Sequence, residues 1–192
     1  MHPTPPRRLL AGMLLVSMLL VGGCQSLPPM PTVDHVDLDR YMGDWYVIAN
    51  IPTFVERDAH NAVETYSMND DGTIDTIFRF RRGGFDGDIR RYNPRGFVRS
   101  EDNAEWGMRF IWPFKAEFLI IWLDDDYQHT VVGRTRRDYV WIMAREPHIP
   151  DAVYDEIVTF LEDVGYDIGE LQRVPQRWPE PDGTDDAAGT RD

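Results

Sequence analysis

Between Trp45 and Arg145 the chain is divided into short segments in which apolar and polar side chains alternate. Turn signals rich in Gly, Asn, Asp or Pro separate these segments, and a period of two is typical of β-strands with one buried face. The pattern predicts eight strands, over residues 45–51, 62–68, 73–82, 96–100, 106–111, 117–123, 129–133 and 139–145. All eight are short and spaced for hairpins, so the sequence predicts an antiparallel all-β fold.

A single helical pattern follows the last of these strands. Pro150 suits a helix start, Asp151 favours the positive N-terminal end, and Gly165 offers a stop. One apolar stripe recurs at helical spacing and consists of Val153, Ile157, Phe160, Leu161 and Val164. Eight hairpin-connected strands and one such helix predict an up-and-down antiparallel barrel with the helix packed outside it. A ninth short strand is predicted over residues 171–175.

Alternation also indicates what fills the barrel. Eight strands enclose an interior that holds either side chains alone or one small ligand. Large aromatic and Met side chains share one face of several strands and suit an apolar cavity. The candidate cavity residues are Tyr66, Phe78, Phe80, Trp106, Met108, Phe110, Trp141 and Met143. The alternative is that these side chains simply fill the core, because alternation does not fix which face is inside.

The N-terminus has the layout of a secretory signal peptide. An Arg7-Arg8 pair precedes an apolar run over residues 9–21, which is too short to span a membrane. The segment Val21-Gly22-Gly23-Cys24 resembles the bacterial lipobox, in which small residues precede a cysteine that becomes lipidated and N-terminal. The resemblance implies that residues 1–23 are a lipoprotein signal peptide and that Cys24 is acylated.

This resemblance also implies a location and a division of the chain. Gln25 is not the aspartate that typically retains such proteins in the inner membrane, so the periplasmic face of the outer membrane is expected. Composition divides the chain further into a lipidated tether over residues 24–35, a barrel with helix over 36–178 and an acidic disordered tail over 179–192.

Charge excludes two kinds of partner. Residues 1–23 contain two arginines and no acidic side chain, so cleavage changes the formal net charge from −13 to −15. Nucleic acid needs a cationic face, and so does electrostatic adhesion to anionic lipid. Membrane attachment is therefore expected through acylated Cys24. Since Cys24 is the only cysteine, no intrachain disulfide is predicted.

Three short motifs occur in order along the predicted strands. Gly43-Asp44-Trp45-Tyr46 opens the first strand, Asp124-Asp125-Asp126-Tyr127 precedes the seventh, and Arg145 ends the last. With the barrel pattern and the late helix, these motifs resemble the lipocalin family, specifically its bacterial lipoprotein branch, which is similar to apolipoprotein D. The resemblance covers residues 36–177, and its second motif departs from the family in having Asp124 where threonine is usual. It implies four structural signature residues: Gly43, Trp45, Asp125 and Arg145.

The first and third motifs predict how the barrel is closed at one end. Gly43 allows a tight turn into the barrel, and Trp45 is expected to plug the closed end. Arg145 is expected to lie across the Trp45 indole as a cation–π partner. Ligand specificity is therefore expected at the other end.

The resemblance, the predicted cavity and the tether lead to one functional hypothesis. The protein is expected to bind fatty acids, lysophospholipids or similar amphiphiles for envelope lipid storage, transport or repair, without a cofactor or a metal. Arg90 and Arg91, in an arginine-rich segment over residues 79–99, are candidates for a rim that receives an anionic head group. The favoured interpretation of this segment is a solvated face balanced by Asp75, Asp86 and Asp88, and the rim is the alternative.

Two other classes of function stay open. An enzyme acting on a lipid or ester substrate could use the histidines that follow the signal peptide, His35, His60, His129 and His148. The chain nevertheless has no Gly-x-Ser-x-Gly elbow and no His-Glu-x-x-His motif. A structural envelope lipoprotein is the other alternative, and strand faces and loops could also support a homodimer.

Overall fold

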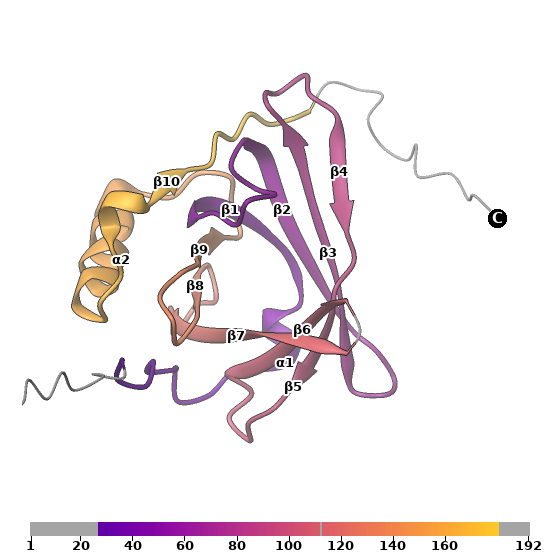
Figure 1. Ribbon diagram of the computed structural model, residues 1–192, viewed down its shortest axis with the longest axis vertical. Coiled ribbons are helices and arrows are strands. Elements are labelled where there is room, and N and C mark those ends of the chain that lie inside the picture. Colours follow the sequence, from indigo (N-terminus) through magenta and orange to yellow (C-terminus); the bar gives the residue numbers. More distant parts are fainter. Residues whose placement is uncertain (1–26, 112, 181–192) are drawn as a thin grey trace, which may run out of the picture.

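The computed structural model describes residues 27–111 and 113–180 (Figure 1). The predicted signal peptide, Cys24 and residues 181–192 of the predicted tail lie outside the described residues. Within the described part of the chain, no helix has both the length and the apolar character needed to cross a membrane.

The strands form one antiparallel sheet that closes on itself, because β1 pairs with β2 on one side and with β9 on the other. β4 and β5 pair in succession with β3, so together they take one strand position. The result is the predicted eight-stranded barrel, and this prediction is confirmed. Its strands are β1 (Gly43–Ile51), β2 (Ala59–Met68), β3 (Thr73–Arg82), β4 (Ile89–Tyr92), β5 (Arg95–Val98), β6 (Glu105–Ile111), β7 (Phe114–Leu123), β8 (His129–Gly133) and β9 (Val140–Ala144).

Strand β4 differs from the prediction, which places only turns between residues 83 and 95. All four of its side chains are exposed, so its sequence lacks the alternation that marks the other strands. Among the described strands it pairs with β3 alone, whereas β5 bridges β3 and β6. The barrel wall is therefore continuous near β5 and has an unpaired edge along β4.

The helix α2 (Asp151–Asp163) covers one side of the barrel, as predicted (Figure 1). Ile157 and Leu161 are buried in an outer apolar layer with side chains from β1, β7, β8 and β9. Gly165 has a φ of +93°, which favours glycine and ends the helix. After the 3₁₀ turn η1 (Ile168–Glu170), the two-residue strand β10 (Gln172–Arg173) pairs with β1 inside the range predicted for a ninth strand.

Part of the predicted tether lies along the barrel. Met30 is buried beneath the outer apolar layer, and the Val33 amide donates to the Ile120 carbonyl at 3.0 Å. The apolar side chains of Met30 and Val33 supply contacts that a freely solvated linker would lack. The described part of the tether therefore extends the core of the domain.

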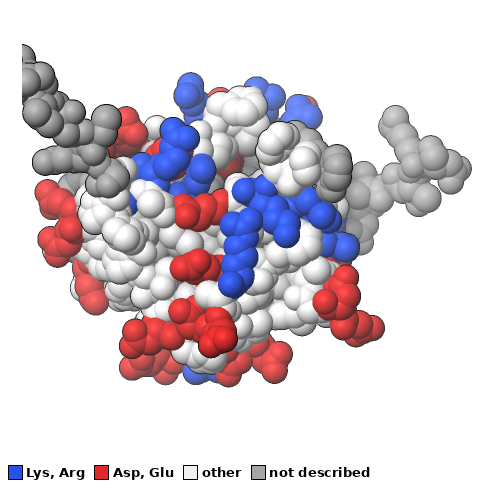
Figure 2. Space-filling view, turned by 60° about the horizontal axis from the view of Figure 1, so that its bottom comes forward, with Lys and Arg blue, Asp and Glu red and all other residues white. Residues whose placement is uncertain are grey.

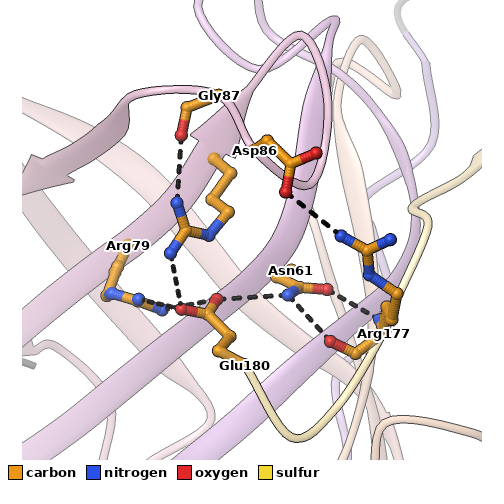
Figure 3. A network of polar contacts seen from close by, with 7 residues as sticks. Asn61, Arg79, Asp86, Gly87, Arg177 and Glu180 are labelled. Atoms are coloured by element: carbon orange, nitrogen blue, oxygen red, sulfur yellow. Dashed lines mark hydrogen bonds and ion pairs between the residues drawn. The ribbon is translucent and has the colours of Figure 1, made fainter. Parts of the chain in front are cut away.

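The C-terminal segment crosses the outer wall of β2 and β3 (Figure 3). The Asn61 side chain binds both the amide and the carbonyl of Arg177, at 2.7 and 3.0 Å. Glu180, the second residue of the predicted tail, forms ion pairs with Arg79 at 2.5 Å and Arg81 at 3.1 Å. Burial acts to raise the pKa of Glu180, but hydrogen bonds from both arginines and from Asn61 lower it to about 2. These contacts fix the last described residues on the barrel.

Candidate ligand cavity

An aromatic cluster closes one end of the barrel. Its centre is Tyr41, the last residue of the short helix α1 (Leu38–Tyr41), which the sequence pattern did not predict because four residues show no periodicity. The Tyr41 ring lies 5.1 Å from that of Trp45, 5.8 Å from that of Tyr66 and 5.4 Å from that of Trp106. All four side chains are buried. We call this cluster, with Phe118 stacked on Trp106, the barrel floor.

The family motifs meet at this floor. The guanidinium carbon of Arg145 lies 3.7 Å from the centroid of the Trp45 ring. Arg145 also donates to the carbonyls of Asp44, Arg40 and Met42 at 2.7, 2.7 and 2.9 Å. Gly43 adopts a φ of +94°, where a side chain would be strained. The arginine therefore ties the last barrel strand to the chain entering the first.

We expect Arg145→Lys to lower the free energy of unfolding by about 2 kcal/mol. A lysine ammonium cannot reach three carbonyls in the planar geometry of a guanidinium, so carbonyls at the entry to the first strand lose their donors. Urea denaturation followed by circular dichroism measures the loss. A variant as stable as the native chain would show that these hydrogen bonds do not hold the floor.

The acidic loop is arranged differently from the expectation for Asp125. Its exposed side chain makes no hydrogen bond with any described residue, and only its backbone carbonyl is used, accepting from Arg40 at 2.9 Å. Asp124 instead accepts from the amides of Gln128 and His129 and from the His129 ring. A carboxylate at position 124 therefore organises the turn at the point where the motif departs from the family.

Above the floor lies a cavity of about 520 Å³, within the range of small-molecule sites. Its exposed wall is mainly apolar, and seven of its 18 lining residues are aromatic and seven are polar or charged. Its lining consists of Thr53, Phe54, Val55, Glu56, Glu64, Thr76, Phe78, Tyr92, Asn93, Pro94, Met108, Phe110, Ala116, Glu117, Phe118, Arg134, Tyr139 and Trp141. Phe54 and Phe110 are 81% and 59% exposed, so they mark the open end, which we call the mouth.

The eight candidate cavity residues divide into two groups. Four line the cavity: Phe78, Met108, Phe110 and Trp141. The other four, Tyr66, Phe80, Trp106 and Met143, are buried but do not line it. Tyr66 and Trp106 belong to the floor, and Phe80 packs on Phe78 and Tyr92. Alternation placed these side chains on one face of their strands, but depth along the strand decides which of them reach the cavity.

Two buried glutamates were missed by the sequence interpretation. Glu56, in the connection before β2, accepts hydrogen bonds from Thr53, Asn50 and Trp141, which occupy both its oxygens. Burial raises the pKa of Glu56, and these hydrogen bonds oppose the shift. No pattern in the sequence singles out a glutamate in a connecting segment, so only the fold reveals this one.

Glu64 lies deeper, on β2, and is only 9% exposed. The Tyr66 hydroxyl donates to its Oε2 atom. Burial is the main cause that raises the pKa of Glu64 to about 7, while the Tyr66 hydrogen bond acts to lower it. Alternation could have indicated its position, because Ala62, Glu64 and Tyr66 share one face of β2.

Arg90 and Arg91 lie on β4 and are exposed. Arg90 is opposite Phe80 in the register and Arg91 is opposite Arg79, so the two side chains point to different faces of the wall. Arg90 lies 3.6 Å from Asp88, and Arg95 lies 3.0 Å from Asp75, two of the three acidic partners expected for a solvated face. Figure 2 shows acidic side chains around much of the visible surface and basic side chains gathered in compact clusters.

The described residues contain no obvious catalytic or metal centre. No group of three or more His, Cys, Asp or Glu side chains among them is arranged to hold a metal ion. The His129 ring is paired with Asp124 at 2.7 Å, and no serine in the described part of the chain bonds to it. The cavity polar groups are therefore the main candidate functional groups.

The comparisons with known proteins agree with this geometry. A family model described as a lipocalin-like domain matches residues 36–176, and the chain belongs to the lipocalin family. The outer membrane lipoprotein Blc of Escherichia coli (strain K12) is 32% identical over 171 residues, which cover 82% of this chain and 90% of that protein. Apolipoprotein D of Bos taurus is 26% identical over 146 residues, 71% of this chain and 73% of that protein. The family predicted from the three motifs is confirmed.

Relatives also occur outside bacteria and vertebrates. Temperature-induced lipocalin-1 of Arabidopsis thaliana is 31% identical over 159 residues, covering 77% of this chain and 83% of that protein. Among solved structures, the cockroach allergen Per a 4 superposes with a TM-score of 0.61 at 16% identity, over 80% of this chain and 96% of that chain. At this identity the structural likeness shows the fold alone.

Proposed function

We propose that this lipocalin is a carrier of small amphiphiles, such as fatty acids or lysophospholipids, for envelope lipid storage, transport or repair. The observation that carries the proposal is the cavity of about 520 Å³, which has a mainly apolar wall with seven aromatic side chains and is open at the mouth. Such a site buries an acyl chain and leaves a head group in water. The relatives named outer membrane lipoprotein Blc support a location at the outer membrane.

Attachment is proposed to occur through acylated Cys24, with the protein on the periplasmic face of the outer membrane. Labelled palmitate should be incorporated into the native chain and not into Cys24→Ser. Incorporation into both would contradict acylation at this cysteine.

The carrier function is tested by extracting lipids from the mature chain, residues 24–192 with Cys24→Ser, after purification without detergent. Mass spectrometry should detect a bound amphiphile, and an emptied sample should take one up with saturable affinity. A chain that neither retains nor takes up any amphiphile would exclude the carrier function.

We further propose that the mouth receives an anionic head group, and the register favours Arg90 over Arg91 for this role. Arg90→Gln should weaken binding of a lysophospholipid about fivefold, since a guanidinium forms charge-assisted hydrogen bonds with phosphate. Arg91→Gln makes the same charge change on the outward face of β4 and is the matched control. Equal affinities for the native chain and Arg90→Gln would remove the proposed rim.

A further inference from the structure

A carboxyl group bounds the inner end of the cavity, where an apolar chain end would have to stop. Glu64 is opposite Trp45 and Phe78 in the register, and Tyr66 of the floor donates a hydrogen bond to it. Glu64 itself lines the cavity. It therefore lies at the boundary between the floor and the space that a ligand can occupy.

One of the two oxygens of the Glu64 carboxyl group accepts no hydrogen bond from the described residues. Oε2 accepts from the Tyr66 hydroxyl, but no hydrogen bond from the described residues reaches Oε1. Oε1 is not among the fully buried side-chain atoms that lack a partner in the described residues, so it is open to the cavity that Glu64 lines. A ligand that displaces water from the cavity without a donor at this point would leave Oε1 unsatisfied, which is costly, whereas a ligand with a donor there would avoid that cost.

A second polar group without a protein partner lines the same cavity. Thr76, on β3, is opposite Tyr66 in the register and lines the cavity. Thr76 is only 2% exposed, and its hydroxyl has no hydrogen-bond partner among the described residues. A rotation about the Cα–Cβ bond exchanges the positions of the hydroxyl and the methyl group, so the hydroxyl can turn toward the cavity.

The other carboxylates of the cavity are already engaged. Glu56 accepts from three donors, and Glu117 accepts from the amide and hydroxyl of Thr135. Arg134, the one basic residue in the cavity lining, lies 3.4 Å from Asp138; its Nε lacks a partner among the described residues, but a guanidinium is a donor only and cannot bind a ligand's donor. Glu64 is thus the lining carboxylate with an oxygen left for a ligand.

We propose that the cavity selects an amphiphile whose buried end carries a hydrogen-bond donor, a hydroxyl or an amino group on the apolar chain, and that Glu64 binds this donor. Thr76 contributes a second polar contact at the same end. The inference rests on the proposed carrier function and narrows its ligands: a chain with a plain methyl end leaves both groups unsatisfied, whereas a chain with a terminal donor satisfies Glu64.

Three probes of equal chain length test the proposal: lauric acid, 12-hydroxydodecanoic acid and 12-aminododecanoic acid. They share one carboxylate head and differ only at the other end. Titration calorimetry on the mature chain at pH 8, above the pKa of about 7 of the Glu64 carboxyl, should give about tenfold tighter binding of the hydroxy and amino probes than of lauric acid, the effect of one hydrogen bond to a charged group. Equal affinities for the three probes, or a preference for lauric acid, would overturn the proposal.

The Glu64→Gln variant tests whether Glu64 is the residue that binds the donor of the ligand. Its carbonyl can still accept from Tyr66, which leaves an NH₂ group facing the cavity, and that group cannot accept from an ammonium. The variant should lose the preference for the amino probe over lauric acid. Thr76→Val, which removes an unpartnered hydroxyl at nearly constant shape, should reduce the same preference about threefold without loss of stability.

The matched control is Asp75→Asn, which removes a carboxylate next to Thr76 in the sequence but on the opposite face of β3. Its probe preferences should equal those of the native chain. An unchanged preference in Glu64→Gln would exclude Glu64 as the binding residue, even though the carrier function stands. Failure of all three probes and of lysophospholipid to bind would instead exclude the carrier function, and the inference with it.

Discussion

Replacing Trp45 with alanine is expected to lower the free energy of unfolding by about 3–5 kcal/mol. The indole is fully buried, and its Nε1 donates to the Tyr41 carbonyl at 2.8 Å. Removing the ring leaves a cavity in the floor, frees a buried carbonyl and takes away the surface on which Arg145 is stacked. Urea denaturation of the mature chain, followed by far-ultraviolet circular dichroism, measures this loss.

Phe110→Ala is the control for Trp45→Ala, because it removes an aromatic ring from the mouth. Phe110 is 59% exposed and lines the cavity, so its loss should change stability by less than about 0.5 kcal/mol and weaken amphiphile binding. The folded fraction of Trp45→Ala should bind amphiphile as the native chain does. If Trp45→Ala kept full stability and lost only ligand affinity, the floor would be a binding site, and the assignment of a structural role to Trp45 would be wrong.

The second large effect is expected at Glu64 and depends on pH. The pKa of its carboxyl is about 7 in the folded chain, against an ordinary value of 4.5. Between these values the unfolded chain releases a proton that the folded chain keeps, so Glu64 lowers native stability as pH rises from 4.5 to 7. Glutamine does not titrate. Glu64→Gln should therefore be more stable than the native chain at pH 8, by on the order of 3 kcal/mol, and nearly equal to it at pH 4.

Chemical denaturation of both chains at pH 4 and pH 8 gives the four values that this prediction needs. Asp75→Asn, at an exposed carboxylate on the outer face of β3, should show no comparable difference between the two pH values. A Glu64→Gln variant that gains the same stability at both pH values would show that the gain comes from packing and not from a buried titrating group.

Alternation carried much of the fold prediction, because most barrel strands bury one face and expose the other. The same reasoning explains its failures. β4 has four exposed side chains, and α1 is too short to show a period, so neither leaves a signal in the sequence. Glu180 resembles a residue of an acidic tail by composition, and only the fold brings it to Arg79 and Arg81.

The cavity was predicted less completely than the barrel. The strand faces of Phe78, Met108 and Trp141, which line the cavity, follow from alternation. Tyr66 and Trp106 instead belong to the floor, because Tyr41 of α1 closes the barrel at their level. That closure depends on a long-range contact between α1 and the barrel strands. A search for alternating apolar residues also passes over a charged side chain such as Glu64, although the same alternation predicts the strand face on which that side chain lies.

The unpaired edge of β4 bears on how the cavity exchanges its contents. Tyr92, Asn93 and Pro94 on that side and Phe110 of β6 all line the cavity, so the break in the wall lies against the ligand space. Because no backbone hydrogen bond links β4 to β6 among the described residues, separating them leaves every strand pairing of the barrel intact. Amide protons on the unpaired edge of β4 should exchange with solvent sooner than those of β7, β8 and β9, which have partners on both sides and, in part, α2 outside them. Opening the wall at this edge would therefore break no strand pairing among the described residues, and it would leave the floor and the helix-covered side in place.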